Sequence, residues 1–246
     1  MRLYVDLGHS RIKWMAHGDT CGLVSGAADA AGNHEALAEQ WSRLPGPAEV
    51  TVASVGTTRA VEMVRRAVEC LGGATIHWLH TPSSGWGVHT AYHEPERLGV
   101  DRFAALVAAH ARHPDGAIVC DVGTAATIDV MVAGDHQGGV ILPGLQSQKR
   151  SLVESVGLSG TDSLHTGSPL GCTTEEGVDL GPAYALVGAC SMVQSADPAY
   201  AGLPMLMTGG DAEQVLTRAP ETWNHLPRLV LEGIEIMARQ IQDGKT

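Results

Sequence analysis

Two similar segments, one at the start of each half of the chain, restrict the fold more than any other feature of the sequence. Val5-Asp6-Leu7-Gly8-His9-Ser10 and Cys120-Asp121-Val122-Gly123-Thr124-Ala125 each end an apolar run with an Asp-x-Gly turn, and a second apolar run follows. A repeat of this kind indicates two similar halves that face each other. We place the boundary near Pro114, which gives expected domains 1–114 and 115–246.

Strand-like and helix-like segments alternate in both halves. The pattern predicts strands at 3–8, 12–18, Glu49–Val55, Thr75–Leu79 and Pro204–Met207, and two more within 116–135, one on each side of the second Asp-x-Gly turn. It predicts helices at His34–Leu44, Thr58–Cys70, Asp101–Arg112, Gln146–Val156, Thr174–Ser195 and Leu226–Gln242, the fifth interrupted by Gly177, Gly181 and Pro182. This alternation is typical of an α/β protein.

The composition favours a small-molecule partner. With 27 acidic and 16 basic residues the formal net charge is −11, and no Lys/Arg-rich run supplies the attraction on which nucleic-acid binding depends. No apolar run approaches the ~20 residues that span a bilayer, and the first residues lack the pattern of a signal peptide. We therefore expect a cytoplasmic protein that binds neither nucleic acid nor membrane.

The Asp-x-Gly turns suit phosphate chemistry, although a simpler interpretation exists. A glycine after a strand-ending aspartate lets the backbone present successive N–H groups to an anion. The aspartate then has a use if Mg²⁺ lies between it and phosphate oxygens, and Lys13 can supply a point charge. In the simpler interpretation Asp-x-Gly is only a turn signal. The second copy, and Thr208-Gly209-Gly210 after a third apolar strand, favour a nucleotide site.

The order of these motifs resembles that of the actin, hexokinase and Hsp70-like ATPase superfamily. Further motifs narrow the resemblance to the type III pantothenate kinases, over nearly the whole chain. The most specific is Gly99-Val100-Asp101-Arg102; the others are Asp6-Leu7-Gly8-His9-Ser10 with Lys13, Asp121-Val122-Gly123-Thr124-Ala125, Gly138-Gly139 followed by Pro143-Gly144, Gly171-x-x-Thr174, and Thr208-Gly209-Gly210. The resemblance implies two ribonuclease-H-like, actin-like ATPase domains facing a nucleotide cleft.

The same resemblance implies ATP-dependent phosphorylation of pantothenate to 4′-phosphopantothenate, the first step of coenzyme A synthesis, by a homodimer that needs Mg²⁺ and a monovalent cation, K⁺ or NH₄⁺. It makes Asp101 the general base and Asp121 the ligand of the monovalent cation, and Asp6 is a candidate for Mg²⁺. The implied ATP-binding residues are Asp6, Leu7, Gly8, His9, Ser10, Arg11, Ile12, Lys13, Thr124, Thr208, Gly209 and Gly210. The implied pantothenate-binding residues are Tyr92, Gly99, Val100, Asp101, Arg102 and Thr174.

The substrate residues also have simpler interpretations. A carboxylate such as Asp101 can take the proton of a primary alcohol, but aspartate at a helix start is also a common cap. The guanidinium of Arg102 can bind the pantothenate carboxylate in a bidentate fork, or belong to an ordinary surface residue. Tyr92 could serve packing alone, and Thr174 could be a helix cap.

His9 departs from the family pattern, which has asparagine there. A neutral imidazole still donates or accepts one hydrogen bond, but it is bulkier and titrates near neutral pH. His9 keeps open one alternative, a regulatory homologue that assists transcription. A second alternative is a related kinase of a sugar or short acid, against which Gly99-Val100-Asp101-Arg102 and Gly171-x-x-Thr174 argue. The presence of Asp6, Lys13, Asp101 and Asp121 favours catalysis.

Overall fold

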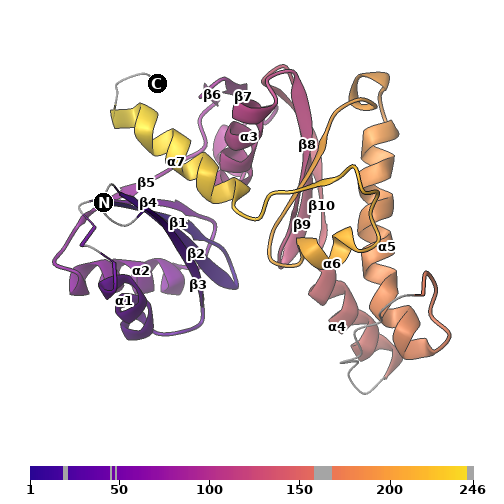
Figure 1. Ribbon diagram of the computed structural model, residues 1–246, viewed down its shortest axis with the longest axis horizontal. Coiled ribbons are helices and arrows are strands. Elements are labelled where there is room, and N and C mark those ends of the chain that lie inside the picture. The colour runs from indigo at the N-terminus through magenta and orange to yellow at the C-terminus, as the bar shows by residue number, and fades with distance from the viewer. Residues whose placement is uncertain (19–21, 45, 48, 158–167, 243–246) are drawn as a thin grey trace. The chain divides into compact units, whose positions relative to one another are not determined.

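The computed structural model describes residues 1–18, 22–44, 46–47, 49–157 and 168–242. Its contacts divide the chain into two compact units (Figure 1). Unit 1 consists of Met1–Arg112 together with Leu229–Thr246, and unit 2 of His113–Arg228. Both contain helices packed on a mixed β-sheet, which confirms the α/β class.

Unit 1 is built on a five-stranded sheet in the order β3-β2-β1-β4-β5. Strands β1, β2 and β3 are antiparallel neighbours, whereas β4 and β5 run parallel to β1. The elements of this unit are β1 (Arg2–Leu7), β2 (Arg11–Gly18), β3 (Gly22–Asp29), α1 (His34–Ser42), β4 (Glu49–Ser54), α2 (Thr58–Cys70), β5 (Thr75–Trp78), β6 (Ser84–Gly85), β7 (Val88–His89), η1 (Pro95–Arg97), α3 (Val100–Arg112) and α7 (Leu229–Gln242).

The alternation of β1 directs its side chains to two different layers. Leu3, Val5 and Leu7 are fully buried in a core that includes the inner faces of α1 and α2. Because successive strand residues point to opposite faces, Tyr4 and Asp6 lie on the other face. That face is covered by α7, which contacts β1, β4 and β2, and by α3, which contacts β4.

Helices α3 and α7 pack with their backbones in close contact. A Cβ atom on Gly233 of α7 would overlap the carbonyl oxygen of Ala104 in α3, so only glycine fits at this crossing. Leu229, Ile234 and Met237 of α7 are fully buried, as expected for the apolar face of an amphipathic helix.

The position of α7 corrects the expected domain division. The boundary falls between Arg112 and His113, close to Pro114, but the second expected domain, 115–246, is not one unit. The apolar face of α7 is buried within unit 1, so the chain enters unit 1, leaves it and returns. The helix also begins at Leu229 rather than Leu226, because the Leu226 N–H donates to the Met207 carbonyl beside a strand.

Unit 2 repeats the plan of unit 1. Its strands lie in the order β12-β11-β8-β9-β10, with β8, β9 and β10 antiparallel and with β11 and β12 parallel to β8. The elements are β8 (Gly116–Val122), β9 (Ala125–Val132), β10 (Asp135–Pro143), α4 (Leu145–Val156), α5 (Thr174–Ser195), η2 (Pro198–Tyr200), β11 (Met205–Thr208), α6 (Ala212–Leu216) and β12 (Asn224–His225). Helix α5 runs without a break through Pro182, contrary to the expected interruption.

Within the described part of the chain, no helix is both long enough and apolar enough to cross a membrane.

Candidate active site

In unit 1 the first Asp-x-Gly motif forms a hairpin turn between β1 and β2. The Gly8 N–H donates to the Arg11 carbonyl at 3.0 Å, and His9 stands exposed in the turn. Asp6 is directly opposite Lys13 in the antiparallel pairing. The Asp6 side chain is buried and Lys13 is half-buried. The pairing therefore brings an acidic and a basic side chain to the same face of the sheet, beside a turn with backbone donors.

The end of β4 holds this turn in place. The Val55 N–H donates to the Leu7 carbonyl at 3.0 Å, which continues the parallel ladder past the last residue of β4. A Cβ atom on Gly56 would lie 2.9 Å from the Gly8 carbonyl oxygen and 3.0 Å from Leu7 Cγ. Since real Cβ atoms avoid such short distances, any larger residue at position 56 must displace the turn.

The first turn of α3 lies next to the same segment. A Cβ atom on Gly99 would be 3.4 Å from Val55 Cγ1 and 2.5 Å from Asp101 Oδ1. Asp101 Oδ1 also accepts the backbone N–H of Arg102 at 2.8 Å. The Asp101 carboxylate therefore lies against the start of its own helix. This helix start is next to Val55, the residue that holds the β1–β2 turn.

Arg102 is a buried residue with a defined partner. Its side chain is among the few charged ones in the core, and Arg102 Nη1 donates to the Tyr92 hydroxyl at 3.0 Å. The guanidinium carbon is 5.7 Å from the centre of the Tyr92 ring, within range of a cation–π contact. The interpretation of Arg102 as an ordinary surface residue is therefore wrong, and Tyr92 does more than fill space.

In unit 2 the second Asp-x-Gly motif also forms a hairpin turn. The Gly123 N–H donates to the Ala125 carbonyl at 2.9 Å between β8 and β9. The Thr124 carbonyl accepts the Gly144 N–H at 3.0 Å and the Ser147 hydroxyl at 2.9 Å. Gly144 lies so close that a Cβ atom there would overlap the Gly123 carbonyl oxygen. The start of α4 therefore fixes the Thr124 turn.

The Thr208-Gly209-Gly210 segment adjoins this turn. Thr208 ends β11 directly beside Asp121 of β8. Gly209 has a φ of +100°, a left-handed conformation that favours glycine. A Cβ atom on Gly209 would lie 2.5 Å from Asp121 Oδ1. Asp121, the predicted cation ligand, and Thr208-Gly209-Gly210, predicted to bind ATP, therefore lie side by side.

Thr174 lies elsewhere in unit 2, at the exposed start of α5. The cap of this helix is Thr173, whose hydroxyl accepts the Glu176 N–H, so the interpretation of Thr174 as a cap is wrong. A Cβ atom on Gly171 would lie 2.7 Å from the Gly177 backbone nitrogen. The glycine of the Gly171-x-x-Thr174 motif is thus required by packing against the first turns of the helix.

Among the described residues no group of three His, Cys, Asp or Glu side chains could hold a metal ion by itself. This arrangement does not exclude Mg²⁺, which is commonly bound through one or two carboxylates, water and substrate phosphates. A single buried carboxylate, Asp6, beside a turn with backbone donors fits that pattern.

Comparison with known proteins decides the family. The family model of type III pantothenate kinase matches residues 2–195. The type III pantothenate kinase of Halorhodospira halophila is 38% identical over 255 residues, covering 95% of this chain and 96% of the relative. That of Nitrosococcus oceani is 33% identical over 251 residues, covering 97% and 94%. The chain belongs to the type III pantothenate kinase family.

Solved structures show the fold of this type III pantothenate kinase family member. A Sinorhizobium meliloti protein assigned as a 2-dehydro-3-deoxygalactonokinase gives a TM-score of 0.61 at 16% identity, covering 98% of this chain and 99% of that one. MreB5 of Spiroplasma citri, solved with ADP, gives 0.50 at 13% identity, covering 99% and 97%. At such low identity the likeness concerns the fold alone, which is that of the actin-like ATPases.

Two glycines that contact the turns were not predicted as functional. The sequence pattern gives Gly56 no role, and it includes Gly144 only in the Pro143-Gly144 motif of the family. A usable signal does exist for Gly56: it lies two residues after the buried strand β4 and precedes Thr57, whose hydroxyl caps α2 by accepting the Ala60 N–H at 3.3 Å. A glycine between a parallel strand and a capped helix is a frequent setting for close backbone approach.

Proposed function

We propose that this chain transfers the terminal phosphoryl group of ATP to pantothenate, giving 4′-phosphopantothenate in the first step of coenzyme A synthesis, with Asp101 as the general base. The observation that carries the proposal is the continuity of contacts in unit 1 from Leu7 through Val55 and Gly99 to Asp101. This continuity supports the proposal, because transfer between two bound substrates requires the base to lie near the turn that binds the phosphates.

Asp101 and Arg102 divide the recognition of pantothenate between them. The attacking primary alcohol must lose its proton as the phosphoryl group arrives, and the Asp101 carboxylate can accept it. The Arg102 N–H donates to Asp101 Oδ1, which fixes the orientation of the carboxylate. Arg102, oriented by Tyr92, supplies a guanidinium for the pantothenate carboxylate. Gly99, Val100 and Thr174 are the further residues proposed to bind pantothenate.

The β1–β2 turn binds the phosphates of ATP in this proposal. The residues Asp6, Leu7, Gly8, His9, Ser10, Arg11, Ile12 and Lys13 form the turn and its two flanking strands. Asp6 would hold Mg²⁺, which neutralises phosphate charge when bound. Lys13 adds a cationic charge from the neighbouring strand. Most of the rate enhancement then comes from positioning and charge stabilisation, because phosphoryl transfer needs little covalent chemistry from the protein.

In unit 2, Thr124 and Thr208-Gly209-Gly210 are the proposed further ATP contacts, and Asp121 is the proposed ligand of K⁺ or NH₄⁺. Support comes from the closeness of Asp121 Oδ1 to Gly209 and from the left-handed backbone there. A monovalent cation at Asp121 would add positive charge near the nucleotide.

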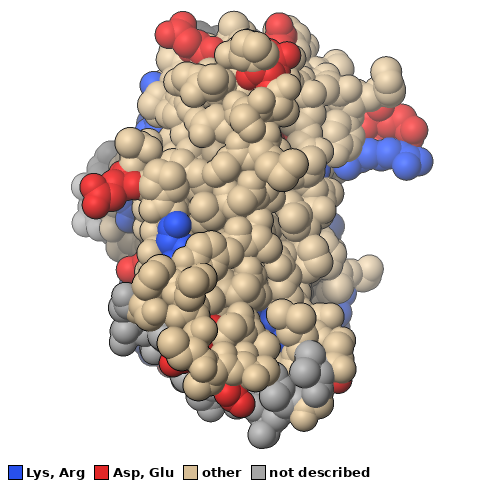
Figure 2. Space-filling view, turned by 90° about the vertical axis from the view of Figure 1, so that its right-hand side faces the viewer, with Lys and Arg blue, Asp and Glu red and all other residues tan. Residues whose placement is uncertain are grey.

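The proposal includes a homodimer in the cytoplasm, with no nucleic-acid partner. Support for the dimer comes from α5, where Met192 and Tyr184 are exposed. Among the described residues, no atom lies within 4 Å of a Cβ atom built on Gly181 or Gly188 of the same helix. Figure 2 views the molecule from the side on which Figure 1 draws α5, and charged side chains are sparse over the middle of this face. Faces depleted in charge are typical of subunit interfaces.

The test is ADP release in the presence of pantothenate, ATP, Mg²⁺ and K⁺. We expect pantothenate-dependent turnover in the wild type and a loss of about 10²- to 10⁴-fold in kcat for Asp101→Asn, the usual contribution of a general base. Asp115→Asn, at an exposed position of unit 2, is the matched control and should keep full activity. Turnover with a sugar or short acid but not with pantothenate would favour the related kinase, and no turnover at all would favour the regulatory homologue.

A further inference from the structure

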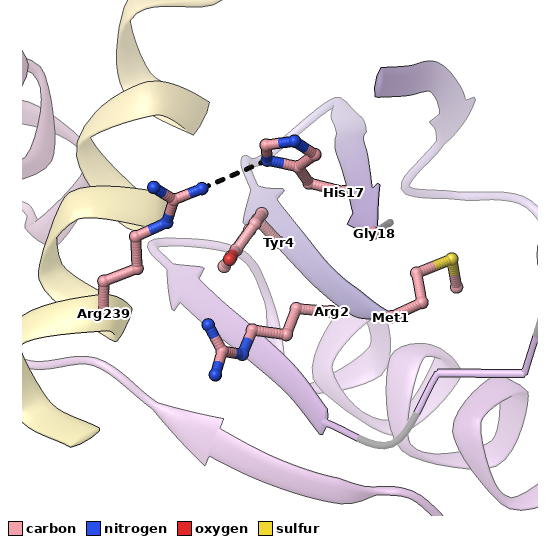
Figure 3. Close-up of a pocket in the computed structure, with 6 residues that line it drawn as sticks. All are labelled: Met1, Arg2, Tyr4, His17, Gly18 and Arg239. Atoms are coloured by element: carbon pink, nitrogen blue, oxygen red, sulfur yellow. Dashed lines mark hydrogen bonds between the residues drawn. The ribbon is translucent and has the colours of Figure 1, made fainter. Parts of the chain in front are cut away.

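Unit 1 contains a cavity that the proposed reaction does not use. It has a volume of about 330 Å³ and is lined by Met1, Arg2, Tyr4, His17, Gly18 and Arg239, which come from β1, β2 and α7 (Figure 3). Arg2 stands four residues before Asp6 on β1, about 13 Å away at about 3.3 Å per residue. The cavity is therefore separate from the β1–β2 turn, although it opens on the same face of the sheet.

Two guanidinium groups approach this cavity from opposite sides. In Figure 3 Arg2 extends from β1 and Arg239 from α7, with the Tyr4 ring between them. Such convergence stands out in a chain with 16 basic and 27 acidic residues. Arg2 Nε lies 3.4 Å from Glu49 Oε2, and Arg239 Nη2 donates to Glu235 Oε1 at 2.6 Å.

These ion pairs occupy only part of each guanidinium. A guanidinium has five N–H donors in a planar fork, so one carboxylate contact leaves further donors for a second acceptor. The two carboxylates also offset the arginine charges, which keeps the expected affinity for an added anion weak. His17 closes the cavity above Arg239, with Nδ1 at 3.2 Å from Arg239 Nη2 and 2.8 Å from Glu235 Oε1.

Tyr4 adds a neutral donor to the floor of the cavity. Its side chain is buried, and burial and the charge of Glu235 raise the pKa of Tyr4 more than the hydrogen bond from Arg239 lowers it. The phenol therefore keeps its proton at neutral pH. A phenol oxygen that accepts from an arginine can still donate its own hydrogen.

We propose that this cavity is a binding site for a small oxyanion, a phosphate or carboxylate group held between Arg2 and Arg239 with the Tyr4 hydroxyl as a further donor. Planar guanidinium groups match the oxygen spacing of both anions. Metal cations are disfavoured by the two arginines, and the volume is at the small end of the range for ligand sites. Because α7 also packs on α3, an anion at this site would brace the helix that carries Asp101.

The test uses the full chain, titrated by calorimetry with inorganic phosphate and, in a second arm, with acetate, at constant ionic strength. We expect saturable millimolar binding of at least one anion, and the arm that binds identifies the ligand as phosphate or carboxylate. In Arg2→Gln and Arg239→Gln the binding should weaken at least about tenfold, the cost of a lost charged hydrogen bond. Arg66→Gln is the matched control, because Arg66 forms the same kind of helical ion pair, with Glu62, away from the cavity.

Two further measurements separate this site from the proposed phosphate turn and from effects of folding. Lys13→Ala should keep the binding, because Lys13 belongs to the turn rather than to the cavity. A wild-type crystal soaked in tungstate should give an anomalous peak between Arg2 and Arg239. Equal affinity in Arg2→Gln, Arg239→Gln and wild type, loss of binding in Lys13→Ala, or anomalous peaks only elsewhere would each overturn the proposal.

Discussion

The two strand-ending aspartates lie in turns that are alike in plan but differ in length and charge. In unit 1 the last paired residues are Leu7 and Ile12, whereas in unit 2 they are Val122 and Ala126, so the second turn is one residue shorter. Each turn packs against a glycine from another part of its own unit, Gly56 in one case and Gly144 in the other. The shared plan therefore extends beyond the motif to the way in which the turn is supported.

The residue opposite the aspartate distinguishes the two turns. Asp6 pairs with Lys13, and Asp121 pairs with Thr127. A lysine beside a carboxylate brings a positive charge to a phosphate, while a threonine offers only a hydroxyl. The proposed roles differ accordingly: the turn of unit 1 would bind a polyphosphate, and Asp121 of unit 2 would bind a cation. The following predictions test this difference, beginning with the largest expected effect.

Removal of Lys13, opposite Asp6, should lower catalysis far more than removal of Thr127, opposite Asp121. We expect Lys13→Ala to lower kcat/KM for ATP by about 10²-fold, as loss of a donor to developing charge does in other enzymes. Thr127→Ala should leave it nearly unchanged. Steady-state ADP release over a range of ATP concentrations measures both, and equal losses would mean that the two turns are equivalent.

Asp121→Asn should change the response to potassium. Loss of the carboxylate should weaken the apparent affinity for K⁺ at least about tenfold, since even indirect partners of a metal contribute that much. The measurement is activity as a function of K⁺ at fixed ionic strength, with Asp6→Asn as the comparison. Asp6→Asn should instead raise the Mg²⁺ requirement, and an unchanged K⁺ curve in Asp121→Asn would remove the assignment.

Gly56→Ala should displace the first turn without removing any chemical group. Its Cβ would press on the Gly8 carbonyl, and a shift of a few tenths of an ångström should raise the KM for ATP about threefold to tenfold while kcat changes less. Gly46→Ala is the matched control, because no atom lies within 4 Å of a Cβ at that position. A fall in thermal stability with an unchanged KM would show that Gly56 serves packing alone.

His9→Asn should have the smallest effect. His9 is exposed in the turn, and exposed substitutions generally change free energies by less than about 0.5 kcal/mol, or about twofold in activity. We expect activity within that range or slightly higher, because asparagine restores the family residue. A large loss in the same ADP assay would show that the imidazole has a role of its own.

Much of the candidate site in each unit could be predicted because its residues are close in the sequence. The β1–β2 hairpin, the start of α3 at Asp101 and the β8–β9 hairpin depend on local alternation and turn residues, which a single sequence displays. The burial of Arg102 is harder to predict, because it depends on Tyr92 ten positions upstream. The interpretations of Arg102 as a surface residue and of Tyr92 as packing alone consider each residue by itself.

Other features depend on contacts that no local pattern encodes. Strand β3 was not predicted: it contains Ser25 and Gly26, and Gly26 is there because the Trp14 ring of β2 lies where its Cβ would be. Strand β10 was also missed, since it begins with polar residues, one of which, His136, is buried through a 2.9 Å contact with Asp129. The role of Gly56 depends on the pairing of β4 with β1, far apart in the chain.

The return of α7 to unit 1 has a consequence for synthesis. During translation the β1–β2 hairpin, α3 and the whole of unit 2 emerge before α7, the helix that packs on β1, β2 and α3 within unit 1. Unit 2 is continuous and can fold at once, whereas the surface of α3 around Ala104 stays uncovered until Gly233 has left the ribosome. Release of the last helix is therefore the event that completes unit 1, and nascent chains paused before residue 229 should be the forms most dependent on chaperones.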